Sequence, residues 1–172
     1  IGHSYDRLKN YAQARFYYRK ASHLRQDDSK LLYKIACTYF NEGQWQSCIK
    51  QLDTAMKIHR LQPEYNLLAG ECKMSLGLYK DAIQYFSNVV RIRPKNAGGW
   101  EALIRCLYKG AFFEEALEQT HSAERMTNGK PLFAFYKAAV LFGFGKTKEA
   151  VLQLELAMGK SPRLLKKFIE LN

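Results

Sequence analysis

The side chains of this sequence that could bind a metal ion or act as nucleophiles are four cysteines and four histidines. No two cysteines have the C-x-x-C spacing of a zinc site, and the histidines are spread over the whole chain. The motifs H-E-x-x-H and G-x-S-x-G and the glycine-rich phosphate loop do not occur. We therefore expect no metal site, no cofactor and no enzymatic activity. The eight residues are Cys37, Cys48, Cys72, Cys106, His3, His23, His59 and His121.

A repeat of 34 residues positions these side chains. Each repeat has a small residue, an aromatic residue three positions before it in four of five copies, and a second small or β-branched residue seven positions after it. The small residues are Ala14, Cys48, Ala82, Ala116 and Ala150; those before them are Tyr11, Trp45, Tyr79, Phe113 and Thr147; those after them are Ala21, Ala55, Val89, Ala123 and Ala157. The shared interval predicts tandem structural repeats.

Within each repeat, apolar residues recur every three or four positions, which is the pattern of amphipathic helices. The segments 31–40 and 45–56 both show this pattern, and Gly43 lies between them. Glycine adopts the left-handed conformation that ends a helix, and Gly77 and Gly145 occupy the equivalent position. Each repeat is therefore predicted to be two antiparallel helices joined by a tight turn.

This pattern resembles the tetratricopeptide repeat family. The clearest copy of the family signature consists of Ala69, Gly70, Gly77, Tyr79, Ala82, Phe86, Val89 and Pro94. The resemblance implies an all-α fold, a right-handed α-α superhelix (solenoid) of about five helical hairpins and a C-terminal capping helix. The implied hairpins of this single array over 1–172 are 1–28, incomplete at its N-terminal end, 29–62, 63–96, 97–130 and 131–162, with the capping helix at 163–172. Because the chain starts at Ile1 with a short first hairpin, we expect it to be a fragment of a longer protein.

In this family the first helix of each hairpin lines a concave groove that holds partners. The resemblance carries this role over to candidate partner-binding residues of the present sequence. They are Lys30, Tyr33, Lys34, Phe40, Asn41, Glu71, Met74, Arg105, Tyr108, Lys109, Phe135, Tyr136 and Phe142. Exposed aromatic residues, Met and Arg contribute most to interface energies. The implied function is a protein–protein interaction scaffold or adaptor that binds a peptide or helical segment in the groove.

The aromatic residues of this set have a second interpretation. Tyr33, Tyr108, Phe135 and Phe142 could instead contact neighbouring hairpins as part of the core. Leu67 and Leu68, from the first helix of the third hairpin, are expected in the core. Some members of the family also clamp the terminal carboxylate of a partner with Lys, Asn and Arg side chains. The corresponding positions here hold Tyr33, Cys37, Leu68, Gly98 and Ala102. Since none of them matches, recognition of chaperone tails is not expected.

The net charge of +11 favours anionic partners such as nucleic acid, acidic protein segments or anionic lipid. Because Lys and Arg are spread along the whole chain without an arginine-rich block, the favoured interpretation is that the charge keeps the surface soluble. The partner expected from the resemblance is a protein or peptide, and this charge would suit one with acidic segments. One alternative is a helical repeat that binds RNA or another polyanion, with Tyr stacking on bases and Lys contacting phosphates; nucleic acid is the less favoured partner. Another alternative is a regulatory module of a longer protein whose catalytic domain lies outside this chain. No apolar run reaches the roughly 18 residues of a membrane span. The cysteine pattern favours reduced thiols and a cytoplasmic location.

Overall fold

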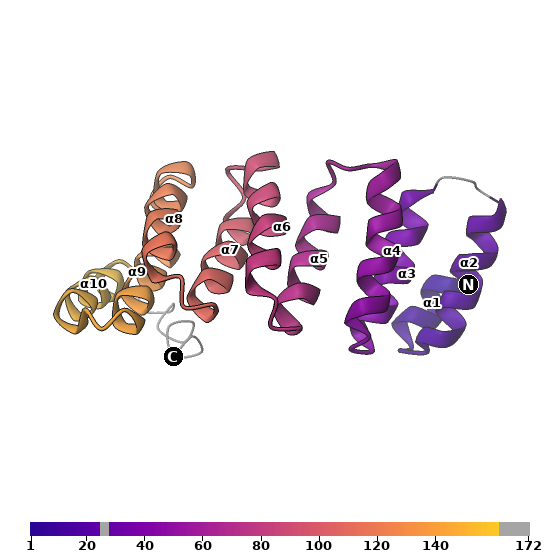
Figure 1. The fold of residues 1–172 in the computed structure, drawn as a ribbon, viewed down its shortest axis with the longest axis horizontal. Coiled ribbons are helices and arrows are strands. Elements are labelled where there is room, and N and C mark those ends of the chain that lie inside the picture. The colour runs from indigo at the N-terminus through magenta and orange to yellow at the C-terminus, as the bar shows by residue number, and fades with distance from the viewer. Residues whose placement is uncertain (25–27, 162–172) are drawn as a thin grey trace. The chain divides into compact units, whose positions relative to one another are not determined.

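The computed structural model describes residues 1–24 and 28–161, and all regular structure in these ranges is helical (Figure 1). The helices alternate between first and second members of hairpins. The first helices are α1 (Gly2–Arg7), α3 (Ser29–Asn41), α5 (Pro63–Ser75), α7 (Ala97–Lys109) and α9 (Pro131–Gly143). The second helices are α2 (Tyr11–Leu24), α4 (Trp45–Ile58), α6 (Tyr79–Ile92), α8 (Phe113–Met126) and α10 (Thr147–Lys160). From α2 onward, equivalent helices start 34 residues apart, as the sequence interval predicts. The capping helix predicted at 163–172 lies outside the described residues.

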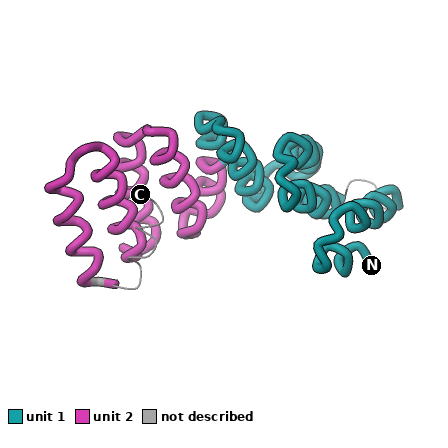
Figure 2. Tube along the Cα trace, turned by 90° about the horizontal axis from the view of Figure 1, so that it is seen from below, with its two compact units in different colours: residues 1–85 teal, residues 86–172 magenta. Residues whose placement is uncertain are grey.

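The chain divides into two compact units, residues 1–85 and residues 86–172 (Figure 2). Unit 1 contains α1 to α5 and the first half of α6, and the described part of unit 2 contains the second half of α6 and α7 to α10. The two units are therefore described one after the other.

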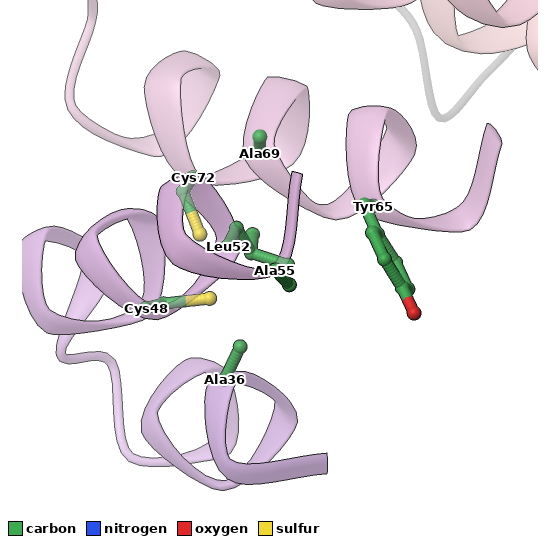
Figure 3. Close-up of a cluster of buried hydrophobic side chains, with 7 residues drawn as sticks. All are labelled: Ala36, Cys48, Leu52, Ala55, Tyr65, Ala69 and Cys72. Carbon is green, nitrogen blue, oxygen red and sulfur yellow. The ribbon is translucent and has the colours of Figure 1, made fainter. Parts of the chain in front are cut away.

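In unit 1, helix α4 packs between α3 and α5 through small side chains (Figure 3). Cys48, Leu52 and Ala55 of α4 are completely buried, together with Ala36 of α3 and Ala69 of α5. Small residues at these positions allow the helix backbones to approach closely, and the larger rings around them fill the remaining space. This cluster explains why the sequence keeps a small residue at fixed intervals.

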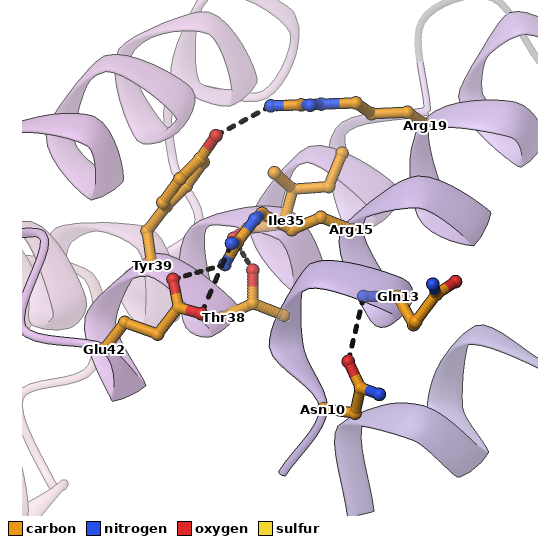
Figure 4. Close-up of polar contacts among 8 residues, drawn as sticks. All are labelled: Asn10, Gln13, Arg15, Arg19, Ile35, Thr38, Tyr39 and Glu42. Carbon is orange, nitrogen blue, oxygen red and sulfur yellow. Dashed lines mark hydrogen bonds and ion pairs between the residues drawn. The ribbon is translucent and has the colours of Figure 1, made fainter.

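The first hairpin contacts the second through a buried apolar cluster of Ala14, Tyr18 and Ile35, and also through polar groups (Figure 4). Arg15 of α2 donates two hydrogen bonds to the carboxylate of Glu42, with Nη1 2.6 Å from Oε2 and Nη2 3.3 Å from Oε1. The guanidinium carbon of Arg15 also lies 4.6 Å from the centre of the Tyr39 ring, and Arg19 donates to the Tyr39 hydroxyl at 2.7 Å. The residues equivalent to Arg15 in the later second helices are apolar: Ile49, Ile83, Leu117 and Val151. The first hairpin thus has a charged contact where the sequence of each later hairpin provides an aliphatic side chain.

The turn inside each hairpin has one residue with a positive φ angle. Gly43 (71°), Gly77 (74°) and Gly145 (80°) adopt it as predicted, while Ala111 (61°) and Lys9 (58°) adopt it without being glycine. Each turn is closed by a backbone bond that spans five residues, such as the bond from the Gln44 amide to the Tyr39 carbonyl at 2.9 Å. This is the Schellman arrangement at the C-terminal end of a helix, which satisfies carbonyls that the helix leaves open.

In unit 2, α7 packs on α8, α8 on α9 and α9 on α10. Helix α9 is apolar on nearly all sides, and eight of its residues are buried. Two glycines allow close approaches: Gly99 faces Val89, and Gly143 faces the rings of Tyr108 and Phe113. Trp100 donates its indole N–H to the Pro94 carbonyl at 2.7 Å, which fixes the entry of the chain into α7.

Candidate partner-binding faces

First helices lie next to one another within each unit, because α3 contacts α5 in unit 1 and α7 contacts α9 in unit 2. Each unit therefore has a continuous face made of first helices. We call the unit 1 face the set Lys30, Tyr33, Lys34, Phe40, Asn41, Leu67, Glu71 and Met74. We call the unit 2 face the set Arg105, Tyr108, Lys109 and Phe142. All of these side chains are exposed or half-buried.

The aromatic residues of the unit 1 face are anchored on one side and accessible on the other. The Tyr33 ring stacks on Tyr65 with centroids 5.0 Å apart, and the hydroxyl of Tyr65 donates to Ser29 at 3.1 Å. Phe40 meets Trp45 edge-on at 5.1 Å. Burial raises the pKa of Tyr33 above its usual value, so that its hydroxyl stays protonated even in mildly alkaline solution. These rings are held rigidly, which lowers the entropic cost of binding a partner.

The charges on the unit 1 face are mixed. Lys30, Lys34 and Asn41 are exposed, while Glu71 is half-buried. The ammonium group of Lys34 lies 5.6 Å from the centre of the Tyr18 ring, within the range of a cation–π contact. Leu67, which is predicted in the core, is 36% exposed and adds an apolar side chain to this face. An apolar centre with a charged rim is the usual composition of a protein interface.

On the unit 2 face, Tyr108 packs edge-on against Phe113 at 5.9 Å and is half-buried. Lys109 is exposed, and Phe142 is the large apolar residue of this face, with 52% of its surface exposed. Arg105 is half-buried. The unit 2 face therefore combines two aromatic rings with two cationic side chains, and Lys109 and Phe142 are its exposed members.

Two residues predicted for the groove are not exposed. Phe135 is 1% exposed and packs with Ala157 of α10, and Tyr136 is 3% exposed. The hydroxyl of Tyr136 donates to Glu101 at 2.8 Å. The expectation that these two rings are accessible is wrong for this structure. The periodicity of α9 could not reveal this, because its apolar residues surround the whole helix and no polar stripe marks a solvent face.

The surroundings of the cysteines and of two histidines, His59 and His121, are those of residues with a structural role. All four cysteines are free thiols. A hydrogen bond with Cys72 and burial raise the pKa of Cys48, which keeps this thiol protonated and unreactive. His59 caps the C-terminal end of α4, where its Nδ1 lies 3.1 Å from Ser29 Oγ, and His121 Nδ1 lies 3.7 Å from Glu124 Oε2. Within residues 1–24 and 28–161, no group of three or more His, Cys, Asp or Glu side chains is arranged to hold a metal ion.

A hollow of about 580 Å³ lies on α2. Since α2 is a second helix, a prediction confined to the first helices does not include it. The hollow is lined by Ala12, Arg15, Phe16, Arg19, Lys20 and His23, and we call it the α2 hollow. In the sequence, these residues recur every three or four positions along one helix, and they place an aromatic ring among cations. This pattern could have indicated the hollow. Among the helices that the structure describes, none is long and apolar enough to cross a membrane.

Comparison with known proteins identifies the fold. A family profile described as anaphase-promoting complex, cyclosome, subunit 3 matches residues 7–89. A search of curated proteins by sequence gives no match. Residues 41 to the end of MamA from Desulfovibrio magneticus RS-1 superpose with a TM-score of 0.81 at 17% identity, covering 97% of this chain and 92% of that one.

Two further solved structures are described as TPR proteins. YrrB, "a TPR protein with an unusual peptide-binding site", has a TM-score of 0.76 at 16% identity, covering 95% of this chain and 84% of that one. TTC0263, a thermophilic protein of Thermus thermophilus, has a TM-score of 0.65 at 16% identity, covering 99% and 94%. The chain is a helical repeat protein with the tetratricopeptide fold, and the predicted fold class is confirmed.

Proposed function

We propose that this protein is an interaction scaffold whose first-helix faces bind a peptide or helical segment of another protein. The main observation is on unit 1, where the contacting helices α3 and α5 carry the exposed Leu67 and the half-buried Tyr33 ring together with the exposed Lys30 and Lys34. Anchored aromatic and apolar residues inside a charged rim provide binding energy at the centre and orientation at the edge.

The compared proteins support the same class of function. YrrB is described as having a peptide-binding site, and the matching family profile describes a subunit of a multiprotein complex. We extend peptide binding to the present chain as a proposal, since the similarity itself concerns the fold. Exposed Lys30 and Lys34 favour a segment that carries carboxylates near its apolar residues.

The test is affinity purification from cells with quantitative mass spectrometry, followed by titration of the purified partner. One variant combines Lys30→Glu with Leu67→Ser on the unit 1 face. The matched control combines Lys50→Glu on the exposed side of α4 with Leu61→Ser, since Leu61 is 68% exposed between α4 and α5. We expect a partner that is retained by the wild type and the control but lost by the face variant. Equal retention by all three proteins would contradict the proposal.

A further inference from the structure

The α2 hollow lies on a different face of unit 1 from the first helices. Ala14 and Tyr18, on the opposite side of α2, are buried at 0% and 5% exposure. In contrast, Ala12, Phe16 and Lys20 are exposed. A ligand in the hollow would therefore contact α2 without covering the unit 1 face.

The ring of Phe16 is 58% exposed. The equivalent residues of α4, α6 and α8 are polar, namely Lys50, Gln84 and Glu118, and α10 has Leu152, which is 56% exposed. A phenylalanine ring left in water forgoes the favourable free energy of burial, which a ligand with an apolar side chain can recover. Its edge-on contact with Tyr17, at 5.3 Å, holds the ring beside the hollow.

The cations of the hollow are available to a ligand to different degrees. Arg15 is already neutralised by the bidentate contact with Glu42. Arg19 donates to the neutral hydroxyl of Tyr39, so its charge is not compensated by that contact. Lys20 is exposed and forms no ion pair among the described residues, and the neighbouring His23 ring is exposed as well. The hollow thus has a surplus of positive charge that a carboxylate could neutralise.

The apolar groups and the uncompensated cations are separated along the helix. Ala12 and Phe16 occupy its N-terminal part together with Arg15, which Glu42 neutralises, and Arg19 and Lys20 follow toward the C-terminal end. From Ala12 to His23 the helix rises about 16 Å, at roughly 1.5 Å per residue. An extended peptide covers this distance with about five residues. A nucleic acid backbone carries evenly spaced phosphates, so a segregated surface favours a peptide over RNA.

We propose that the α2 hollow is a second binding site, which holds a short acidic peptide segment whose apolar side chain covers Phe16 and whose carboxylates contact Arg19 and Lys20. The site is independent of the first-helix faces. It would allow the scaffold to hold two segments at the same time, which raises the apparent affinity for a partner that contains both.

The test uses the full chain and fluorescence anisotropy of a labelled peptide with two leucines followed by four glutamates. Two control peptides replace the glutamates by glutamine or the leucines by serine. The protein variants are Lys20→Glu and Phe16→Ala, both at exposed positions, and the matched control is Lys80→Glu on the exposed side of α6. Lys80→Glu makes the same change in net charge outside the hollow.

We expect saturable binding that Lys20→Glu weakens about tenfold and Phe16→Ala about threefold, whereas Lys80→Glu changes it less than about twofold. Both control peptides should bind more weakly than the parent peptide. Lack of saturable binding, or equal effects of Lys20→Glu and Lys80→Glu, would overturn the proposal. Equal binding of the serine peptide, with displacement by single-stranded RNA, would overturn it in favour of a general polyanion surface.

The unit 1 face variant, Lys30→Glu with Leu67→Ser, separates this site from the proposed function. If the peptide binds in the α2 hollow, this variant should bind it as the wild type does. If the variant loses the peptide while Lys20→Glu retains it, the peptide occupies the unit 1 face. In that case the scaffold function stands and the second site does not.

Discussion

Arg15 and Glu42 form a bidentate pair across the junction of the first two hairpins, with 2.6 Å between Nη1 and Oε2. Their side chains are only 14% and 25% exposed, so water screens the pair less than it screens a fully exposed ion pair. The guanidinium group also lies against the Tyr39 ring. This arrangement replaces the aliphatic contact that Ile49 provides beside the core of the second and third hairpins.

Replacing Arg15 by alanine should lower the free energy of unfolding by about 1–2 kcal/mol, because a charge-assisted bidentate contact and a ring contact are lost. A double-mutant cycle with Glu42→Ala, measured by urea denaturation, should give a coupling energy of about 1 kcal/mol that decreases in high salt. The exposed Lys20→Ala serves as a control and should change stability by less than about 0.5 kcal/mol. Additive effects of the two alanines would show that the pair contributes nothing.

The pH dependence of stability should report on Cys48. Its hydrogen bond with Cys72 and its burial raise its pKa, so the folded protein keeps this thiol protonated where the unfolded chain, with an ordinary thiol pKa of about 8.5, releases the proton. Below that pH both states hold the proton and the thiol contributes no pH dependence. Above it the unfolded state binds fewer protons, so the free energy of unfolding falls as pH rises, by up to about 1.4 kcal/mol per unit.

Cys48→Ala removes this thiol and introduces the residue found at the equivalent position of the other repeats. Under reducing conditions, we expect the stability of the wild type to fall more steeply than that of Cys48→Ala between about pH 8.5 and about pH 10. The difference in unfolding free energy between the wild type and Cys48→Ala at neutral pH measures packing alone and provides the baseline. Parallel curves over the whole range would contradict the raised pKa.

Ala111 has a φ of 61°, in the turn position where Gly43, Gly77 and Gly145 stand in other hairpins. Side chains with a Cβ atom are disfavoured in this conformation, and glycine is not. Ala111→Gly should therefore raise the free energy of unfolding by about 0.5–1 kcal/mol in thermal or urea denaturation. The reciprocal change Gly77→Ala should lower it, although the added Cβ would meet no atom within 4 Å. A destabilising Ala111→Gly would argue against the turn geometry.

Gly143 is required by packing. A Cβ atom at this position would lie 2.8 Å from Cε2 of Tyr108 and 2.9 Å from Cε1 of Phe113. Gly143→Ala should lower stability by about 1–3 kcal/mol, because both rings must move. Gly159→Ala in α10 is the matched control, since its Cβ would meet nothing within 4 Å. We expect the control to gain up to about 1 kcal/mol from its higher helix propensity, so equal losses for both variants would contradict the close approach.

Periodicity was sufficient to predict the hairpins. The small residues that repeat at Cys48 and Ala55 are completely buried, and Gly43 ends a helix as its position indicates. These features depend on spacing along the chain, which the sequence contains directly. Helix starts at Pro63 and Pro131 also agree with the tolerance of proline in the first turn.

Accessibility of single side chains was harder to predict. Phe135 and Phe142 belong to the same helix and were both expected in the groove, yet one is 1% exposed and the other 52%. The difference depends on which neighbours each ring meets, as Phe135 does with Ala157, and such contacts join residues distant in sequence. The α2 hollow was missed for a similar reason, since its shape depends on how Arg15 and Arg19 extend toward α3.

The Arg15–Glu42 contact between the first two hairpins has a consequence for how the array unfolds. In repeat proteins each repeat is stabilised by its neighbours, so weakening a contact of the terminal repeat promotes its local unfolding. Salt screens the Arg15–Glu42 ion pair, but it does not weaken the buried apolar cluster around Cys48 and Leu52. We therefore expect the N-terminal hairpin to unfold locally more often as ionic strength rises. Amide hydrogen exchange should then be faster in α1 and α2 than in α4.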